Sequence, residues 1–588
     1  MSDAVSGQPE RGDRLRPGEW PERVVAICFY GRSGSVFLQS LLDSHPRLLS
    51  IPGNLYTYFD EFWEENNRLE REKLVASFCQ YYAFMFDGRN KCKADSSGEL
   101  DRMGVNEDQT VGVDPLVYLD LVFRFLDMGG KVTRKKLFQA AHLAYHAALG
   151  RAPIQNPIIV FQLHNPSGKR AEGLIEDFPD TIFLHMIREP LQTLNSFFKH
   201  TYVHEKYRPK FKTFAWVLST ILLGGTPANN EYKDRSRAVR LEDLKANPRS
   251  TMERVCQWIG IPWDDILLQS TINGKQFWFP TTEGKRLQGF EKDHLHQDNT
   301  KYFTWLDRFR LHVILAEKRR LWGYPTAPWA SWNWVRYLVF FLLRFSFLTE
   351  RLMWPYIDAE TLDPSFVIRQ ILWIAWRDLF TKDRKEVTLL EFSPKPGFQQ
   401  AWERICILIC SGIDVTAEGK DLEDSEYQLR HALQRFPQSR EIYTYLSILL
   451  TRQNRPKEAM QVVEEGLRHH KESSDLFLGR GDIHFQEKEF AKAEADYHLA
   501  LKYSQSMNVE ALVGLGDLCI RTNRQPEGLE FLRAAVRYDV TKVHAWAMLA
   551  LGADQIQNHD LCHLGKRMLA ALHPGHPAID WLNKKKSS

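Results

Sequence analysis

Three apolar runs in the first two hundred residues have the pattern of strands buried on both faces. Residues 23–30 (RVVAICFY), 158–163 (IIVFQL) and 181–187 (TIFLHMI) are short, apolar and partly β-branched. The first and the last continue through a polar turn into runs with helical spacing, 36–43 and 191–199. Strands that alternate with helices predict a parallel sheet. The front of the chain is therefore expected to be an α/β domain.

The last third of the chain has a different pattern, which recurs every 34 or 35 residues. Larger apolar residues such as Tyr443, Phe477 and Leu512 mark an early position of each unit. Two series of mostly small residues mark later positions, where they let paired helices pack closely: Ala432, Gly466, Ala500 and Ala535, and Ala459, Ala493, Gly528 and Cys562. This pattern resembles the tetratricopeptide repeat, with about four helix–turn–helix units between residues 421 and 588. It predicts an all-α solenoid.

A solenoid of stacked helix pairs presents an extended concave groove. The repeats are therefore expected to bind a protein or peptide partner. The alternative is an appendage that stabilises the chain or its dimer.

Residues 326–420 match neither pattern, and we interpret them as a Trp-rich helical linker. Six of the 17 Trp of the chain lie between residues 329 and 376. The apolar run 337–343 lies between Arg336 and Arg344, far short of the roughly 20 residues that span a membrane. A buried connecting helix is the favoured interpretation. The alternative is an interfacial helix that gives the protein peripheral membrane contact.

Composition and charge narrow the classes of protein further. The 588 residues are 44% hydrophobic and 26% charged, which argues against a disordered chain, a collagen or a coiled coil. The net charge of +3 makes bulk nucleic-acid binding unexpected. Eight Cys are scattered without a C-x-x-C pair, so neither a disulfide framework nor a zinc cluster is indicated. Residues 1–21 are polar and expected to be disordered, and a cytoplasmic location is expected.

The turn after the first strand has the composition of an anion-binding loop. Residues 31–35 (GRSGS) lie between a strand and a helix, where free backbone N–H groups and the helix dipole favour a phosphate. The loop lacks the Lys of the nucleotide loop G-x-x-x-x-G-K-[ST], and Arg32 supplies a cation instead. An ordinary ATPase or GTPase is therefore disfavoured. A plain tight turn is the alternative.

A second candidate anion site follows the strand 181–187. Arg188 lies at the end of this strand, and Ser196 lies two turns into the next helix. An Arg can bind a phosphate bidentately, and a hydroxyl adds a further donor.

Together the two segments resemble the sulfotransferases that use 3′-phosphoadenosine-5′-phosphosulfate (PAPS), and the resemblance covers about residues 22–325. It implies an α/β P-loop domain in which the first loop binds the 5′-phosphosulfate and the R-x7-S segment binds the 3′-phosphate. Residues 239–248, 255–261 and 305–324 also resemble the family. The donor-binding residues that the resemblance implies are Arg32, Ser33, Gly34, Ser35, Val36, Arg188 and Ser196, with Lys285 and Arg286 as a second grip on the 3′-phosphate or, equally, a solvated basic turn.

The resemblance implies transfer of a sulfuryl group to a hydroxyl or amine, without a metal, with Arg32 stabilising charge. His164, directly after the strand 158–163, is the favoured general base. Other branches of the family carry a Glu where Asn54 stands here, and Asp60 and Glu61 are the fallback. The acceptor stays open: a glycan, a lipid-linked sugar, a small molecule or a peptide. The repeats could bind this acceptor in place of a separate partner. The alternatives in function are a P-loop kinase-like enzyme and a non-catalytic, repeat-based adaptor.

Overall fold

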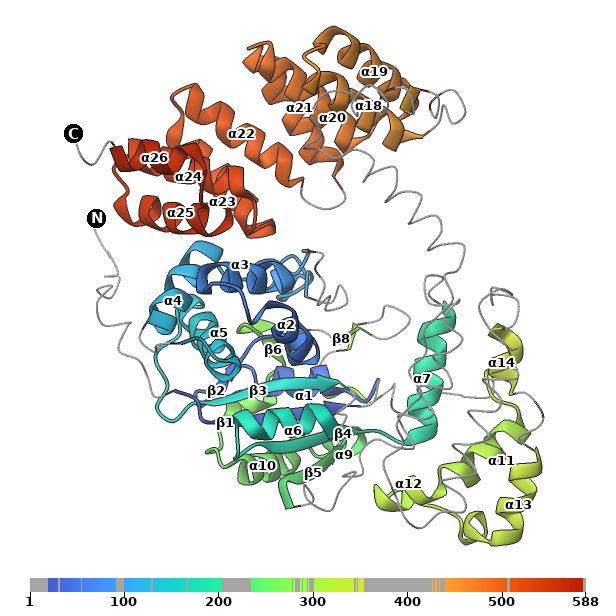
Figure 1. Ribbon diagram of the computed structural model, residues 1–588. Helices are drawn as coiled ribbons and strands as arrows, with labels where there is room; N and C mark the ends of the chain where they lie inside the picture. The colour runs from blue at the N-terminus through green and yellow to red at the C-terminus, as the bar shows by residue number, and fades with distance from the viewer. Residues whose placement is uncertain are drawn as a thin grey trace, which may run out of the picture. The chain divides into compact units, whose positions relative to one another are not determined.

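The computed structural model describes most of the chain in two compact units (Figure 1). The first unit contains residues 1–65, 94–111 and 124–395, and the second contains 66–93, 112–123 and 396–588. The residues described are 20–29, 32–53, 55–90, 92, 100–127, 131–164, 168–203, 234–277, 279–280, 286–287, 289–292, 295, 301–342, 345, 347–353, 426, 429–430, 433, 439–504 and 508–584.

Within these residues, the first unit contains a parallel sheet of five strands in the order β2-β3-β1-β4-β5. The strands are β1 (Arg23–Phe29), β2 (Leu48–Ser50), β3 (Ile158–His164), β4 (Ile182–Ile187) and β5 (Ser236–Arg240). The three runs predicted as strands are β1, β3 and β4, and they form the centre of the sheet. The prediction of an α/β domain is confirmed.

Both faces of the sheet are covered, because alternate residues of each strand point to opposite sides. Val25 and Ile27 pack on one face against α1 (Ser35–Leu42), α9 (Leu241–Ala246) and α10 (Pro248–Ile259). On the other face Phe161 contacts Tyr56 of η2 (Leu55–Tyr58) and Phe138 of α5 (Arg134–Ala148), with ring centroids 4.7 and 5.4 Å away. Figure 1 shows helices in front of and behind the strands.

The described remainder of the first unit follows the sheet. Helix α2 (Phe59–Asn66) reaches the boundary of the unit. The other helices and short strands are α6 (Gly168–Asp177), α7 (Pro190–Val203), η6 (Asp265–Leu268), β6 (Thr271–Ile272), β7 (Lys275–Gln276), β8 (Phe279–Pro280), β9 (Arg286–Leu287), α11 (Trp305–Ile314), α12 (Ala316–Leu321), η7 (Pro328–Ser331), α13 (Asn333–Leu342) and α14 (Leu348–Met353).

The described part of the predicted linker packs on α11. The guanidinium of the buried Arg310 donates to the carbonyl of Leu342, the last residue of α13, and to that of Phe345. One side of α13 is buried, and Trp334 on the other side is 63% exposed. In the part of the chain that the structure describes, no helix has the length and apolar character needed to cross a membrane. Residues 354–420 of the predicted linker lie outside the described residues.

A buried histidine in α5 predicts a pH dependence of stability. The side chain of His142 is fully buried, and its Nδ1–H donates to the carbonyl of Phe138 at 2.8 Å. Burial lowers the pKa of His142 from 6.5 to about 4. The folded chain therefore holds this imidazole neutral at a pH where the unfolded chain protonates it.

Replacing His142 by glutamine is expected to make the free energy of unfolding depend less steeply on pH between pH 6.5 and pH 4. The folded pKa lies below the unfolded one, so the stabilising effect is complete above pH 6.5. It is lost as the pH falls toward 4, at about 1.4 kcal/mol per pH unit for one group. Urea unfolding at pH 7 and pH 5 measures this slope in both proteins. Equal slopes in the wild type and in His142→Gln would contradict the assignment.

The repeats of the second unit are four described helix pairs followed by a single helix. The pairs begin at Arg440, Ser474, Val509 and Val543, which reproduces the predicted spacing of 34 or 35 residues. The helices are α18 (Arg440–Arg452), α19 (Pro456–His469), α20 (Ser474–Gln486), α21 (Phe490–Tyr503), α22 (Val509–Arg521), α23 (Gln525–Tyr538), α24 (Val543–Gln555), α25 (His559–Leu572) and α26 (Pro577–Lys584). The predicted helical solenoid is confirmed.

The small residues that marked the repeat lie where paired helices come closest. Ala459 and Ala493 are fully buried, and a Cβ on Gly528 would lie 2.9 Å from the carbonyl oxygen of Gly516. Tyr443 is also buried, and a Cβ on Gly466 would lie 3.0 Å from its side chain. Ala432 lies outside the described residues.

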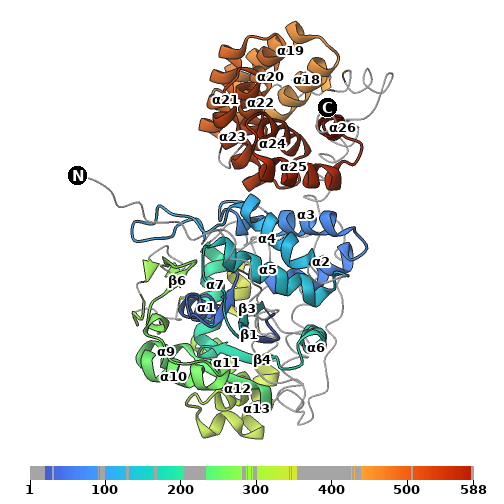
Figure 2. The same cartoon turned by 90° about the vertical axis from the view of Figure 1, so that its left-hand side faces the viewer.

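The second unit also contains helices from the front half of the chain. They are α3 (Arg71–Tyr81), η3 (Ala83–Met85) and the part of α4 (Pro115–Asp127) up to Phe123. Figure 2 shows α3 beside α25, and the contacts between the two helices agree with this view. Nothing in the hydrophobic pattern of the sequence indicated that these residues fold with the repeats.

Candidate functional site

The carboxyl ends of four parallel strands bring the predicted site residues to one edge of the sheet. Phe29, the last residue of β1, pairs with His164 of β3 and with Met186 of β4. Ile187 of β4 pairs with Arg240 at the end of β5. The loop after β1, the end of β3 and the segment from Arg188 onward therefore lie at the same edge. Ligands of open α/β sheets bind outside the carboxyl ends of the strands.

The loop after β1 has a backbone suited to wrapping an anion. Gly34 adopts a φ of 90° at the N-cap of α1, and Arg32 adopts a φ of 40°. A Cβ on Gly34 would approach the side chain of Leu241 to 2.8 Å, so this position favours glycine for both conformation and space. The hydroxyl of Ser33 is buried and has no hydrogen-bond partner among the described residues. Tyr30 and Gly31 lie outside the described residues.

A buried chain of side-chain hydrogen bonds ties the loop to the sheet. The Ser35 hydroxyl donates to Oε1 of Gln162 at 3.1 Å, and Gln162 donates to Oε1 of Gln39 at 2.6 Å. Gln39 in turn donates to the Ser50 hydroxyl and the Ile51 carbonyl, both at 3.1 Å. Sequence reasoning missed Gln39 and Gln162. The available signal was a polar residue inside an otherwise apolar strand or helix.

Arg188 is a buried cation at the end of β4. It is only 3% exposed, and its Nη2 donates to the carbonyl of Leu295 at 3.0 Å. Burial lowers the pKa of Arg188, and the charge of the nearby Arg32 lowers it further, while Glu242 and Glu189 act in the opposite direction. The charges of Arg32 and Arg188 therefore interact. Anionic groups bound at this sheet edge would stabilise both cations, one of which is buried.

Carboxylates hold the turn that follows Arg188. The backbone N–H of Glu189 donates to Oε1 of Glu242 at 3.0 Å, and the Tyr324 hydroxyl donates to Oε2 of Glu242 at 2.7 Å. Arg319 forms an ion pair with Glu189 at 3.0 Å. Glu242 and Tyr324, which belong to segments that resemble the family, therefore position this turn.

The remaining residues predicted to bind the donor lie in three different elements. Ser196 lies in α7 and is buried, in the second turn of the helix that begins two residues after Arg188. Val36 lies in the first turn of α1 and is partly exposed. Arg286 begins β9, where its backbone pairs with Pro280, while Lys285 lies outside the described residues.

The candidates for general base are also placed differently. His164 ends β3 beside the strand that leads into the loop. Asp60 of α2 forms an ion pair with Arg134 at 3.4 Å, which ties up one of the two fallback carboxylates. Glu61 is exposed on the same helix, and Asn54 lies outside the described residues.

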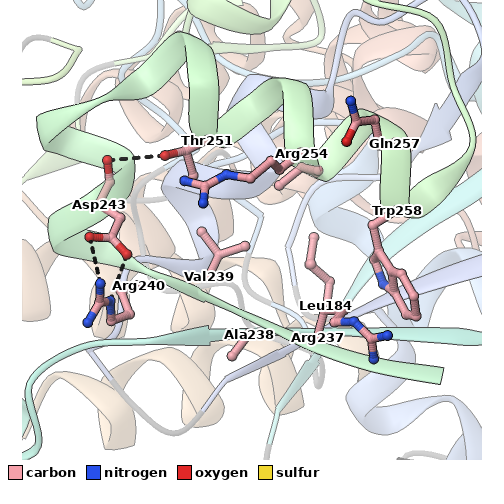
Figure 3. Close-up of a pocket in the computed structure, with 11 residues that line it drawn as sticks. Leu184, Arg237, Ala238, Val239, Arg240, Asp243, Thr251, Arg254, Gln257 and Trp258 are labelled. Carbon is pink, nitrogen blue, oxygen red and sulfur yellow. Dashed lines mark hydrogen bonds and ion pairs between the residues drawn. The ribbon is translucent and has the colours of Figure 1, made fainter. Parts of the chain in front are cut away.

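A separate hollow of about 440 Å³ lies beside β5 and α10 (Figure 3). In it Arg240 donates to the carboxylate of Asp243 at 2.6 Å. The lining residues are Leu184, Arg237, Ala238, Val239, Arg240, Asp243, Thr251, Arg254, Val255, Gln257 and Trp258. None of the predicted donor residues lines this hollow, so it is distinct from the candidate site. Among the described residues, no group of His, Cys, Asp or Glu is arranged to hold a metal ion.

Comparison with known families finds one match in the front of the chain and one in the repeats. Residues 25–265 match the model of the sulfotransferase family. This segment is a sulfotransferase domain. Residues 452–507 and 478–539 match the model of the tetratricopeptide repeat. The match to the sulfotransferase family contains the loop, Arg188, Ser196 and His164 together, and both predicted families are confirmed.

Solved structures similar to parts of the chain include a sulfotransferase domain and tetratricopeptide repeat proteins. A sulfotransferase domain from the curacin biosynthetic pathway is 14% identical over 53% of this chain and 99% of its own, with a TM-score of 0.27. YrrB, described as a TPR protein with an unusual peptide-binding site, is 15% identical over 27% of this chain and 84% of its own, with a TM-score of 0.23. A tetratricopeptide repeat protein from Parabacteroides merdae is 19% identical over 32% of this chain and 74% of its own, with a TM-score of 0.25. No curated protein matches the chain.

Proposed function

We propose that the sulfotransferase domain moves a sulfuryl group from PAPS to a hydroxyl or amine of an acceptor. The observation that carries the proposal is the pair of cations at one sheet edge, Arg32 in the loop and the buried Arg188 after β4. PAPS carries anionic groups at the 3′ and 5′ positions of one nucleoside, and a cation after each of the two neighbouring strands would match them. A pocket that binds a single phosphate group needs only one cationic site.

The residues present fit the two ends of this donor. The unpartnered hydroxyl of Ser33, the free N–H groups at the start of α1 and Arg32 are suited to the 5′-phosphosulfate. Arg188 and the buried Ser196 are suited to the 3′-phosphate. The absence of a Lys from the loop supports this donor over ATP or GTP.

The donor supplies the sulfuryl group, and the chain supplies position and charge. Arg32 and the N–H groups of the loop would stabilise the negative charge that develops on the leaving phosphate during transfer. His164 is proposed to take the proton of the acceptor, since an imidazole suits general-base work near neutral pH. The ion pair between Asp60 and Arg134 favours His164 over that carboxylate.

The repeats are proposed to bind a protein or peptide, because stacked helix pairs expose an extended surface. We also propose a cytoplasmic location, which rests on the composition of the chain and its scattered cysteines. The acceptor classes compatible with the sequence are a glycan, a lipid-linked sugar, a small molecule and a peptide.

Calorimetry with the full chain tests the donor. Adenosine 3′,5′-bisphosphate is expected to bind at least tenfold more tightly than ATP, because only the former carries the 3′-phosphate for Arg188. Replacing Arg32 by alanine is expected to weaken binding of the bisphosphate about tenfold, since one charge-assisted contact is lost. Equal or tighter binding of ATP would favour the kinase-like alternative. No binding of either nucleotide would favour the non-catalytic adaptor.

A further inference from the structure

The last repeats contact residues that the sulfotransferase match contains. Arg567 of α25 forms an ion pair with Glu72 of α3, with Nη2 and Oε1 2.9 Å apart. The guanidinium of Arg567 also lies over the ring of Phe123, 4.0 Å from its centroid. The side chains of Arg567 and Glu72 are 22% and 24% exposed, so water screens the pair only in part. The ion pair and the ring contact anchor α25 to both front segments of the second unit.

A second set of contacts surrounds the buried carboxylate of Asp87. The Tyr538 hydroxyl, from the end of α23, donates to Oδ2 of Asp87 at 3.1 Å, and Arg89 donates to both carboxylate oxygens. Nδ2 of Asn90 donates to the backbone carbonyl of Arg537 at 3.0 Å. Burial opposes the ionised form, yet hydrogen bonds from Arg89 and Tyr538 hold the pKa of Asp87 below its usual range. The carboxylate therefore stays charged and needs these donors.

The contacts join segments that are far apart in the sequence. Residues 66–93 and 112–123 lie between segments of the first unit in sequence, yet they fold with the repeats. Both segments are inside residues 25–265, which match the sulfotransferase family. Part of the sulfotransferase sequence is therefore held by repeats that begin more than three hundred residues later.

We propose that the last two helix pairs of the array are an internal docking surface for residues 66–93 and 112–123. The occupant is this segment because the surface offers matched groups to it: a cation for Glu72, a hydroxyl for Asp87 and a carbonyl for Asn90. An outside protein or peptide would then bind the first helix pairs, from α18 to α21.

Hydrogen exchange measured by mass spectrometry on the full chain tests the docking. Replacing Arg567 by alanine is expected to speed exchange in peptides from 71–90 about tenfold, because an ion pair and a cation–ring contact are lost. The matched control is Arg524→Ala, which removes a 2.9 Å ion pair to Glu494 inside the array. The control is expected to leave the exchange of 71–90 unchanged.

A charge swap separates docking from a general loss of folding. Glu72→Arg alone is expected to speed exchange in 71–90, and Glu72→Arg with Arg567→Glu is expected to restore part of the protection. No effect of Arg567→Ala, an equal effect of Arg524→Ala, or no recovery in the swap would overturn the proposal. Protection of 71–90 that rises with protein concentration would assign the surface to a second copy of the chain instead.

The docking and the donor assignment fail separately. The exchange measurement involves no nucleotide, and affinity for adenosine 3′,5′-bisphosphate is expected to change less than twofold in Arg567→Ala. A chain that shows the docking but binds no bisphosphate would overturn the proposed function alone.

Discussion

Replacing Arg188 by alanine is expected to weaken binding of adenosine 3′,5′-bisphosphate by about 10- to 100-fold. A buried, charge-assisted contact of this kind is worth about 1.5–3 kcal/mol, and the loss also leaves the 3′-phosphate desolvated without a counter-charge. Isothermal titration calorimetry on the full chain measures the change. Arg188→Lys is expected to recover part of the affinity, since it keeps the charge and loses the planar, two-pronged donor.

The matched control for Arg188 is Arg249→Ala on α10. Arg249 is an exposed arginine paired with Glu253 at 3.1 Å, and its removal is expected to leave affinity for the bisphosphate unchanged. Melting curves of both variants show whether the loss of the Leu295 contact also unfolds the site. Unchanged affinity in a folded Arg188→Ala protein would place the 3′-phosphate elsewhere.

Replacing Gly112 by alanine is expected to destabilise the second unit by about 3 kcal/mol or more. Gly112 has a φ of 151°, which side-chain-bearing residues rarely adopt, and a Cβ there would overlap the carbonyl of Phe86. The overlap is with backbone, so no side-chain rotation relieves it. Chemical unfolding, with hydrogen exchange in the repeats as the readout, measures the effect.

Gly150→Ala separates conformational strain from overlap. Gly150 has a φ of 75°, and nothing lies within 4 Å of the place where its Cβ would stand. This variant is therefore expected to lose only about 1–2 kcal/mol, the cost of the left-handed conformation. A loss as large as that in Gly112→Ala would show that contact with Phe86 is not the cause.

The sequence predicts those parts of the site whose residues lie close together in the chain. The strand before Arg32, the turn that contains Gly34 and the helix after it are neighbours in sequence, and so are Arg188 and Ser196. Hydrophobic runs and turn residues therefore predict them directly. The repeat was predictable for the same reason, since the close approach at Gly466 and Gly528 recurs with a fixed period.

The supporting contacts could not be predicted, because they join distant segments. The amide of Gln162 in β3 accepts a hydrogen bond from Ser35 of α1, and Tyr324 reaches Glu242 across more than eighty residues. Glu72 and Arg567 are farther apart still, and each alone has the appearance of an ordinary charged residue on a helix surface. No local pattern marks such a pair, and only the folded chain brings its members together.

The buried series of hydrogen bonds from Ser35 through Gln162 and Gln39 to Ile51 has a fixed donor-to-acceptor direction. A backbone carbonyl can only accept, so the Ile51 carbonyl fixes which end of the Gln39 amide faces it. This orientation passes through Gln162 and requires Ser35 to spend its one hydroxyl proton on Gln162. The two serines of the loop are therefore not equivalent. Ser33 keeps a proton to give to an anion, whereas Ser35 offers a bound anion only its backbone N–H.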